Sequence, residues 1–191
     1  MAQTDLTDKT VKQRFKTIDM VYIAVGTVLI AVCSWISIPF IVPFTLQTFA
    51  VFFVLSLSGG MKGTISIAIY ILLGAIGVPV FSGMTGGIGK LAGVTGGYII
   101  GFVFTGLLYW LIEILAGKKL TVKIISLAAG LLVCYAFGTA WFMVVYARQN
   151  GPIGLGAALG MCVFPFILPD LAKLAAAVFV SLKLGKILHI H

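Results

Sequence analysis

Long apolar runs that carry almost no charge recur along the whole chain. Hydrophobic residues make up 61% of the 191 residues and charged residues only 9%, and the mean hydropathy is +1.17. The surface of a water-soluble protein could not accommodate such a composition, whereas a lipid bilayer can. In lipid, a helix satisfies its own backbone hydrogen bonds. The sequence therefore predicts an all-α integral membrane protein.

The apolar runs are long enough to predict six transmembrane helices, since one span needs about 20 apolar residues. The sixth is expected to begin at Pro169, because proline fits the first turn of a helix. The segment 154–168 is rich in Gly, Phe and Pro and is expected to form an extracellular lid or re-entrant piece. Residues 1–17 form a polar N-terminal segment, and 1–191 is interpreted as a single membrane domain. The spans are expected at about 18–38, 44–57, 63–78, 94–116, 122–146 and 169–188.

The basic residues divide unevenly between alternate loops. Short cytoplasmic loops of membrane proteins collect Lys and Arg, and only Lys90 and Arg148 fall on the side opposite to the basic N-terminal segment. Both termini are therefore expected in the cytoplasm, with the protein crossing the cell membrane several times. The net charge of +8 reflects this topology, and no basic groove with interleaved aromatic residues predicts a nucleic-acid partner.

The sequence lacks the residues that several classes of enzyme and cofactor-binding protein need. The stretch Gly83 to Leu91 would need Gly at Met84 and Ser or Thr at Leu91 to form a phosphate-binding loop. His189 and His191 lie at the extreme C-terminus, and the three cysteines are dispersed in apolar runs, so no metal motif is present. We expect no enzymatic activity, no metal and no bound cofactor.

Asp170 and Lys173 are two charges inside an otherwise apolar run. Three residues apart on a helix, they share a face, and each costs about 2.5 to 3.5 kcal/mol at the centre of a bilayer. Asp170 could instead favour a helix N-terminus, with Lys173 extending toward the membrane surface. Intramembrane charges more often mark a functional site, so we interpret the pair as part of an outward-facing binding pocket.

Two unusual loops are expected to lie beside this pair. In the first, residues 39–48, two prolines favour extended backbone, and Thr45, Gln47 and Thr48 supply hydroxyl and amide groups. The second, residues 77–98, is too rich in glycine to be helical throughout and would let its backbone approach a ligand. Glycines there could also simply form turns and helix contacts. Together these elements predict a mostly apolar pocket for a small amphipathic ligand.

Four segments, 42–48, 77–83, 94–98 and 169–173, resemble the signature stretches of the BioY family in order and approximate spacing. The family usually has proline where this chain has Val94. The resemblance implies the fold of an S component of an energy-coupling factor transporter. The resemblance also implies that the protein captures biotin outside the cell and transports it together with a transmembrane coupling subunit and two cytoplasmic ATPases. Biotin would be the transported ligand and not a cofactor.

The resemblance also implies roles for particular residues. Asp170 would accept hydrogen bonds from the ureido N–H groups of biotin, and Lys173 would donate to the ureido oxygen or the valerate carboxylate, although these roles could be exchanged. The other substrate-binding residues would be Gln47, Thr45, Gly86 and Gly87, which form hydrogen bonds, and Tyr98, Phe44 and Phe81, which enclose the ligand. The family's A-x-x-x-A helix contact would be represented by Ala24, Thr27 and Ala31 as the partner-binding face.

Other functions remain compatible with the residues alone. An S component for another vitamin would have the same composition and topology. A self-sufficient facilitator would be expected to carry a charged path through the membrane. A membrane enzyme using Asp170 and Lys173 as acid and base would need further catalytic groups at that level.

Overall fold

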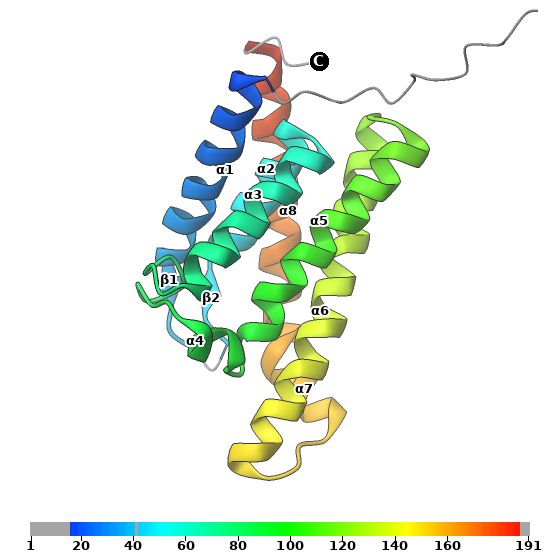
Figure 1. Cartoon of the computed structure of the whole chain (residues 1–191). Helices are drawn as coiled ribbons and strands as arrows, with labels where there is room; N and C mark the ends of the chain where they lie inside the picture. Colours follow the sequence, from blue (N-terminus) through cyan, green and yellow to red (C-terminus); the bar gives the residue numbers. More distant parts are fainter. Residues whose placement is uncertain (1–15, 41, 188–191) are drawn as a thin grey trace, which may run out of the picture.

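Helices dominate the computed structural model, which describes residues 16–40 and 42–187. Their axes run roughly side by side, and the start of α1 and the end of α8 lie at the same end of the bundle (Figure 1). The described elements, in chain order, are α1 (Thr17–Trp35), β1 (Ser37–Ile38), β2 (Phe44–Thr45), α2 (Gln47–Ser58), α3 (Gly60–Ala75), α4 (Ile88–Ala92), α5 (Gly96–Ala116), α6 (Leu120–Asn150), α7 (Leu155–Cys162) and α8 (Phe164–Ile187).

Among these described residues, four helices are long and apolar enough to cross a membrane: α1, α5, α6 and α8. Helices α2 and α3 are apolar but shorter, with 12 and 16 residues. Each of the six spans predicted from the sequence falls on one of these six helices, with ends displaced by several residues. The largest displacements are at the start of α8 and at the outer end of α6, which runs four residues past the expected Tyr146. Residues 1–15 of the predicted N-terminal segment, and residue 188 of the last span, lie outside the described residues.

The prediction that the last helix begins at Pro169 is wrong. Helix α8 begins at Phe164 and includes Pro169 in its interior. Neighbouring groups can compensate for the hydrogen bond that a proline removes in a transmembrane helix, so an internal proline is tolerated there. The expected lid, residues 154–168, consists of α7 followed by the first five residues of α8.

A short hairpin departs from the all-α prediction. Strands β1 and β2 pair antiparallel, with Ser37 opposite Thr45 and Ile38 opposite Phe44. The N–H of Leu46 donates to the carbonyl of Ile36 and closes the hairpin at its base. Two prolines inside the connection favour the extended backbone there. The hairpin places Thr45 two residues before the start of α2, at the end of the bundle away from the start of α1 (Figure 1).

The most extensive helix contact joins α5 and α6, and glycines allow the two helices to approach closely. A Cβ atom at Gly97 would lie 2.3 Å from Cβ of Trp141, and one at Gly138 would lie 2.3 Å from the ring of Tyr98. Real Cβ atoms do not approach other atoms so closely, so only glycine permits this separation. Small residues serve the same purpose where membrane helices pack tightly. As a result, Tyr98 lies against α6, with its ring beside the cavity described below.

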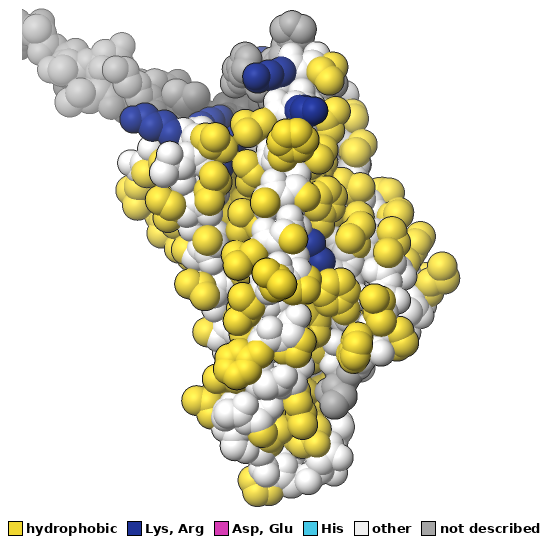
Figure 2. Space-filling model, turned by 180° about the vertical axis from the view of Figure 1, so that it is seen from behind, with side chains coloured by type: hydrophobic (Ala, Val, Ile, Leu, Met, Phe, Trp, Pro, Cys, Tyr) yellow, Lys and Arg dark blue, Asp and Glu magenta, His cyan; other side chains and the backbone are white. Residues whose placement is uncertain are grey.

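Charged side chains concentrate at one end of the bundle. In Figure 2, Lys and Arg side chains gather mainly near the upper end of the face shown, and hydrophobic side chains cover most of the rest. At that end Lys62 pairs with Asp19 at 2.5 Å. Glu113 accepts from the first N–H of α3 at Gly60, and Lys123 donates to the Ser56 carbonyl in the last turn of α2. Both contacts satisfy helix-end groups that have no partner within their own helix.

Candidate ligand-binding site

Asp170 and Lys173 lie one turn apart on α8, facing the interior of the bundle. Only 4% of Asp170 and 8% of Lys173 is exposed, and the Lys173 Nζ lies 2.9 Å from the Asp170 Oδ1. A buried charge needs an opposite charge and further hydrogen bonds to offset its lost hydration. The structure supplies both.

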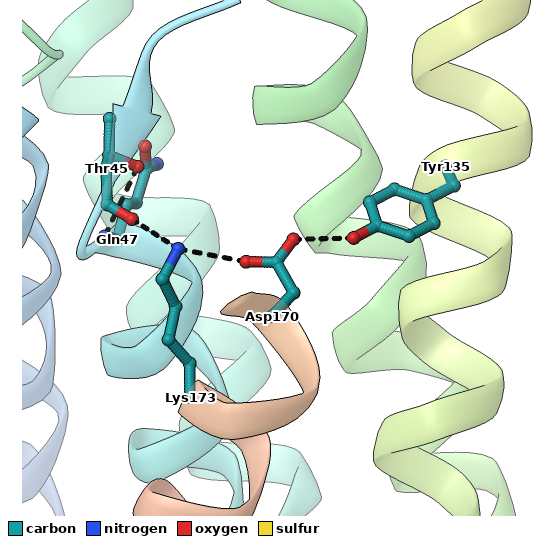
Figure 3. Close-up of polar contacts among 5 residues, drawn as sticks. All are labelled: Thr45, Gln47, Tyr135, Asp170 and Lys173. Atoms are coloured by element: carbon teal, nitrogen blue, oxygen red, sulfur yellow. Dashed lines mark hydrogen bonds and ion pairs between the residues drawn. The ribbon is translucent and has the colours of Figure 1, made fainter. Parts of the chain in front are cut away.

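Three neighbouring residues complete the environment of the pair, and two of them, Tyr135 and Thr45, are drawn in Figure 3. Tyr135 on α6 donates its hydroxyl to the Asp170 Oδ2 at 2.7 Å. The Lys173 Nζ donates to the Thr45 carbonyl oxygen at 2.7 Å and lies 4.0 Å from the centre of the Phe44 ring. The network therefore connects α6, α8 and the β2 strand.

The ammonium group of Lys173 has three N–H donors, and three partners surround it. Asp170 and the Thr45 carbonyl accept two of them, and the Phe44 ring faces the ammonium as a cation–π partner. Each Asp170 oxygen, in contrast, accepts one described hydrogen bond although a carboxylate oxygen can accept about two. In this arrangement Asp170 has more capacity for a new polar partner than Lys173.

A cavity of about 70 Å³ adjoins the pair, which is several times the roughly 10–15 Å³ that one buried water needs. Its walls come from α2, α5, α6, α7, α8 and the segments that precede α2, α4 and α5. Most lining groups are apolar, with a few polar groups among them, as is typical of small-molecule sites. The lining residues are Val42, Pro43, Thr45, Gln47, Thr48, Ser82, Thr95, Tyr98, Ile99, Phe102, Leu131, Cys134, Tyr135, Cys162, Phe166, Asp170 and Lys173.

Several residues expected from the sequence meet at this cavity. Asp170, Lys173, Thr45, Gln47 and Tyr98 all line it. The Gln47 amide nitrogen donates to the Tyr70 hydroxyl at 3.0 Å, which fixes the orientation of the amide.

Phe44 belongs to the same region although it does not line the cavity. Its ring stacks on Phe166 with 5.9 Å between centroids and contacts the ammonium of Lys173. Phe166 does line the cavity. Phe44 therefore reaches the site through its two neighbours.

The expected contributions of Phe81, Gly86 and Gly87 are not seen in this arrangement. Phe81 is fully buried and meets Tyr70 edge-on at 5.5 Å, with its ring against Gly74. The N–H of Gly87 donates to the Gly74 carbonyl, and a side chain at Gly86 would collide with the backbone of the same loop. These residues hold the glycine-rich segment against α3 and lie outside the cavity lining.

The three residues expected to form one partner-binding face on α1 do not share an exposed surface. Thr27 is buried and donates from its hydroxyl to the Ser66 carbonyl on α3. Ala31 is also buried, whereas Ala24 is exposed. Thr27 and Ala31 pack inside the protein because α1 lies against α2 and α3. Their contact with a partner subunit stays a prediction.

Tyr135 is the main site residue that sequence reasoning missed. It lies in the middle of a long apolar run, where it resembles many core aromatics. One feature of the sequence pointed to this contact. A tyrosine hydroxyl inside the membrane needs a hydrogen-bond partner, and Asp170 is an acceptor inside another predicted span. The sequence does not reveal that α6 and α8 bring these two groups together.

An apolar helical bundle with a buried ion pair beside a small cavity defines a membrane protein built to hold a small ligand. The BioY family model matches residues 7–189, and this chain belongs to that family. A biotin transporter BioY from Thermotoga maritima is 40% identical over 164 residues, covering 84% of this chain and 92% of that protein. The biotin transporter BioY2 of Lactococcus lactis is 35% identical over 163 residues, covering 84% and 86%.

The fold has a solved counterpart. The crystal structure of the S component for biotin from an ECF-type ABC transporter superposes with a TM-score of 0.78 at 26% sequence identity, covering 91% of this chain and 95% of that one. The chain therefore has the fold of an S component.

Proposed function

We propose that this chain is the biotin-binding subunit of a vitamin importer. It captures biotin outside the cell and releases it inward with a separate ATP-driven coupling module. Family membership, relatives named as biotin transporters and the S-component fold support this proposal. The single structural observation that carries it is the buried network of Asp170, Lys173 and Tyr135 beside a mostly apolar cavity.

The chemistry of biotin suits this arrangement. A ureido group offers two N–H donors and one carbonyl acceptor, and the Asp170 carboxylate retains acceptor capacity for such donors. Tyr98 and Phe166 provide aromatic surface in the cavity lining for the bicycle and its tail. Gln47, Thr45 and Thr48 are further polar residues in the lining, whose side chains could donate to a carboxylate or carbonyl of the ligand.

Lys173 contacts the ligand only if one of its present partners gives way. A ureido oxygen or valerate carboxylate would replace the Thr45 carbonyl, which now accepts from Lys173 at 2.7 Å. Because Thr45 belongs to β2, ligand binding is then coupled to the position of the hairpin. Such a movement would close the pocket over the ligand.

The energy for transport comes from other subunits in this proposal. A transmembrane coupling subunit and two cytoplasmic ATPases drive the reorientation of this chain, which lies in the cell membrane with both termini in the cytoplasm. The concentration of Lys and Arg side chains near one end of the described helices supports that orientation.

Calorimetric titration of the purified, detergent-solubilised protein with biotin tests the proposal, with thiamin and riboflavin as comparators. Saturable, stoichiometric binding of biotin alone is the expected result. Binding of another vitamin would retain the S-component role and overturn the substrate. Uptake of biotin into liposomes by this chain alone would instead favour a self-sufficient facilitator.

A further inference from the structure

The loops at the outer ends of α2 and α3 expose large apolar side chains. The loop cap is defined here as residues 36–40, 42–46 and 76–93. Phe40, Ile76, Met84 and Ile88 in this cap are 68%, 77%, 65% and 72% exposed. Lys90 is the one charged residue in these segments. Water-facing loops are usually polar, so this surface needs another explanation.

Helix lengths place the loop cap close to the membrane. At about 1.5 Å per residue, α2 and α3 extend about 18 and 24 Å, whereas the hydrocarbon core is about 30 Å thick. Helix α2 ends and helix α3 begins at Gly59, so the last turn of α2 and the first turn of α3 lie at the same end of the bundle. Their opposite ends therefore fall short of the far side of the hydrocarbon core, and the loop cap occupies the remaining depth.

The neighbouring helices indicate the same depth. Helix α5 has 21 residues, or about 31 Å, which matches the hydrocarbon thickness. In Figure 1, β1, β2 and α4 lie near the level of the outer end of α5, while the end of α6 and α7 extend well beyond them. The loop cap thus lies near the boundary between acyl chains and headgroups, whereas α7 lies farther out.

Several backbone groups of the loop cap have hydrogen-bond partners within the protein, as a membrane environment favours. The carbonyls of Pro79 and Val80 accept from the side chains of Trp35 and Ser34 on α1. The N–H of Gly87 donates to the Gly74 carbonyl at the end of α3. Irregular backbone near lipid is tolerated only when its polar groups find partners in the protein. A loop in bulk water has no need of these contacts, since water would supply the partners.

We propose that the loop cap lies in the interfacial layer of the bilayer and that phospholipid acyl chains of the outer leaflet cover Phe40, Ile76, Met84 and Ile88. The exposed apolar surface of the cap continues without a charged rim onto α1 and α3, where Val28 and Leu72 are also exposed. This continuity favours lipid over a second protein. The mouth of the cavity consequently opens at the membrane interface.

Nitroxide spin labels test the depth of the cap independently of any biotin binding. Ile88→Cys and Phe40→Cys are each labelled in a background in which the buried Cys33, Cys134 and Cys162 are replaced by Ala. The proteins are reconstituted in vesicles of phosphatidylcholine and phosphatidylglycerol. Power saturation then compares accessibility to oxygen, which concentrates in lipid, with accessibility to a water-soluble nickel chelate.

Two labelled positions calibrate the scale: Val28→Cys, on the exposed face of α1, and Asn150→Cys, at the exposed end of α6. The proposal predicts that labels at Ile88 and Phe40 favour oxygen over the chelate, as at Val28 but less strongly. A preference for the chelate, as at Asn150, would overturn it. Low accessibility to both reagents would show a protein partner over the cap and would overturn it equally. If one variant fails to fold, Ile76→Cys and Met84→Cys report on the same surface.

Discussion

The α6–α8 wall of the cavity differs from the segment that connects α3 to α5, residues 76–95, which is the part of the glycine-rich run before α5 and is called the glycine-rich segment here. Tyr135, Asp170 and Lys173 come from regular helices and converge on one another at the cavity. The glycine-rich segment directs Phe81 and the Gly87 N–H toward α3 instead. From this segment only Ser82 and Thr95 line the cavity, within the part of the chain that the structure describes.

The difference follows from the way in which a protein satisfies its backbone hydrogen bonds inside a lipid bilayer. A helix satisfies its own backbone and leaves its side chains free for a ligand, whereas an irregular segment must first satisfy its backbone through other parts of the protein. We therefore expect the glycine-rich segment to serve mainly as a scaffold. Recognition is assigned to the helices, and substitutions of Phe81, Asp170 and Tyr135 test that division.

Phe81→Ala is expected to have the largest effect, on stability. Removing a fully buried ring leaves a cavity between α3 and the glycine-rich segment and should cost about 3–5 kcal/mol of unfolding free energy. Thermal unfolding in detergent measures it, with the exposed Phe40→Ala as the matched control. If Phe81→Ala kept its unfolding temperature and lost biotin binding, the segment would be a ligand contact and not a scaffold.

Asp170→Asn should weaken biotin binding by about 1–3 kcal/mol, because an amide cannot replace the charged acceptor that the ureido donors need. Calorimetry on the monodisperse variant measures the loss. Asp19→Asn is the control, since Asp19 pairs with Lys62 at the opposite end of the bundle. Equal biotin affinity in both variants would remove Asp170 from the site.

Tyr135→Phe should weaken biotin binding by about 0.5–1.5 kcal/mol through the loss of one hydrogen bond to the carboxylate. Tyr135 acts by positioning Asp170, so in the Asp170→Asn background the same change should have a much smaller effect. Tyr146→Phe, near the end of α6, is the control. Additive effects of Tyr135→Phe and Asp170→Asn would argue against positioning.

Substitutions on α1 should change biotin binding least. Ala24→Leu alters an exposed position and should leave stability and biotin affinity unchanged while reducing co-purification with the coupling subunit. Thr27→Leu, in contrast, overpacks the buried contact with α3 and should cost about 1–3 kcal/mol of stability. Undiminished co-purification of Ala24→Leu would remove this face of α1 from the proposed interface.

The sequence predicted the helices well and their ends poorly. Hydrophobic runs located all six long or intermediate helices, because a membrane helix must be apolar along most of its length. The sequence did not predict the β1–β2 hairpin or the start of α8 at Phe164. The hairpin joins residues that lie close together in the sequence, and α8 accommodates Pro169 in its interior. Hydrophobicity reveals neither, because it reports neither local strand pairing nor a proline that a membrane helix tolerates.

For the site, the charges were predictable and their partners were not. Asp170 and Lys173 stand out because ions are costly in lipid, and Thr45, Gln47 and Tyr98 do line the same cavity. The expectation for Phe81, Gly86 and Gly87 rested on resemblance and glycine content, neither of which shows which way a loop faces. Tyr135 required knowledge of which helix lies opposite α8.

A crystal structure of the protein with biotin bound tests the central claim most directly. The account predicts the ureido nitrogens within about 3.2 Å of the Asp170 carboxylate, with Tyr135 still bonded to that carboxylate and the Gly86–Gly87 backbone free of ligand contacts. A biotin molecule held by the glycine-rich segment, with the Asp170–Tyr135–Lys173 network untouched, would contradict it.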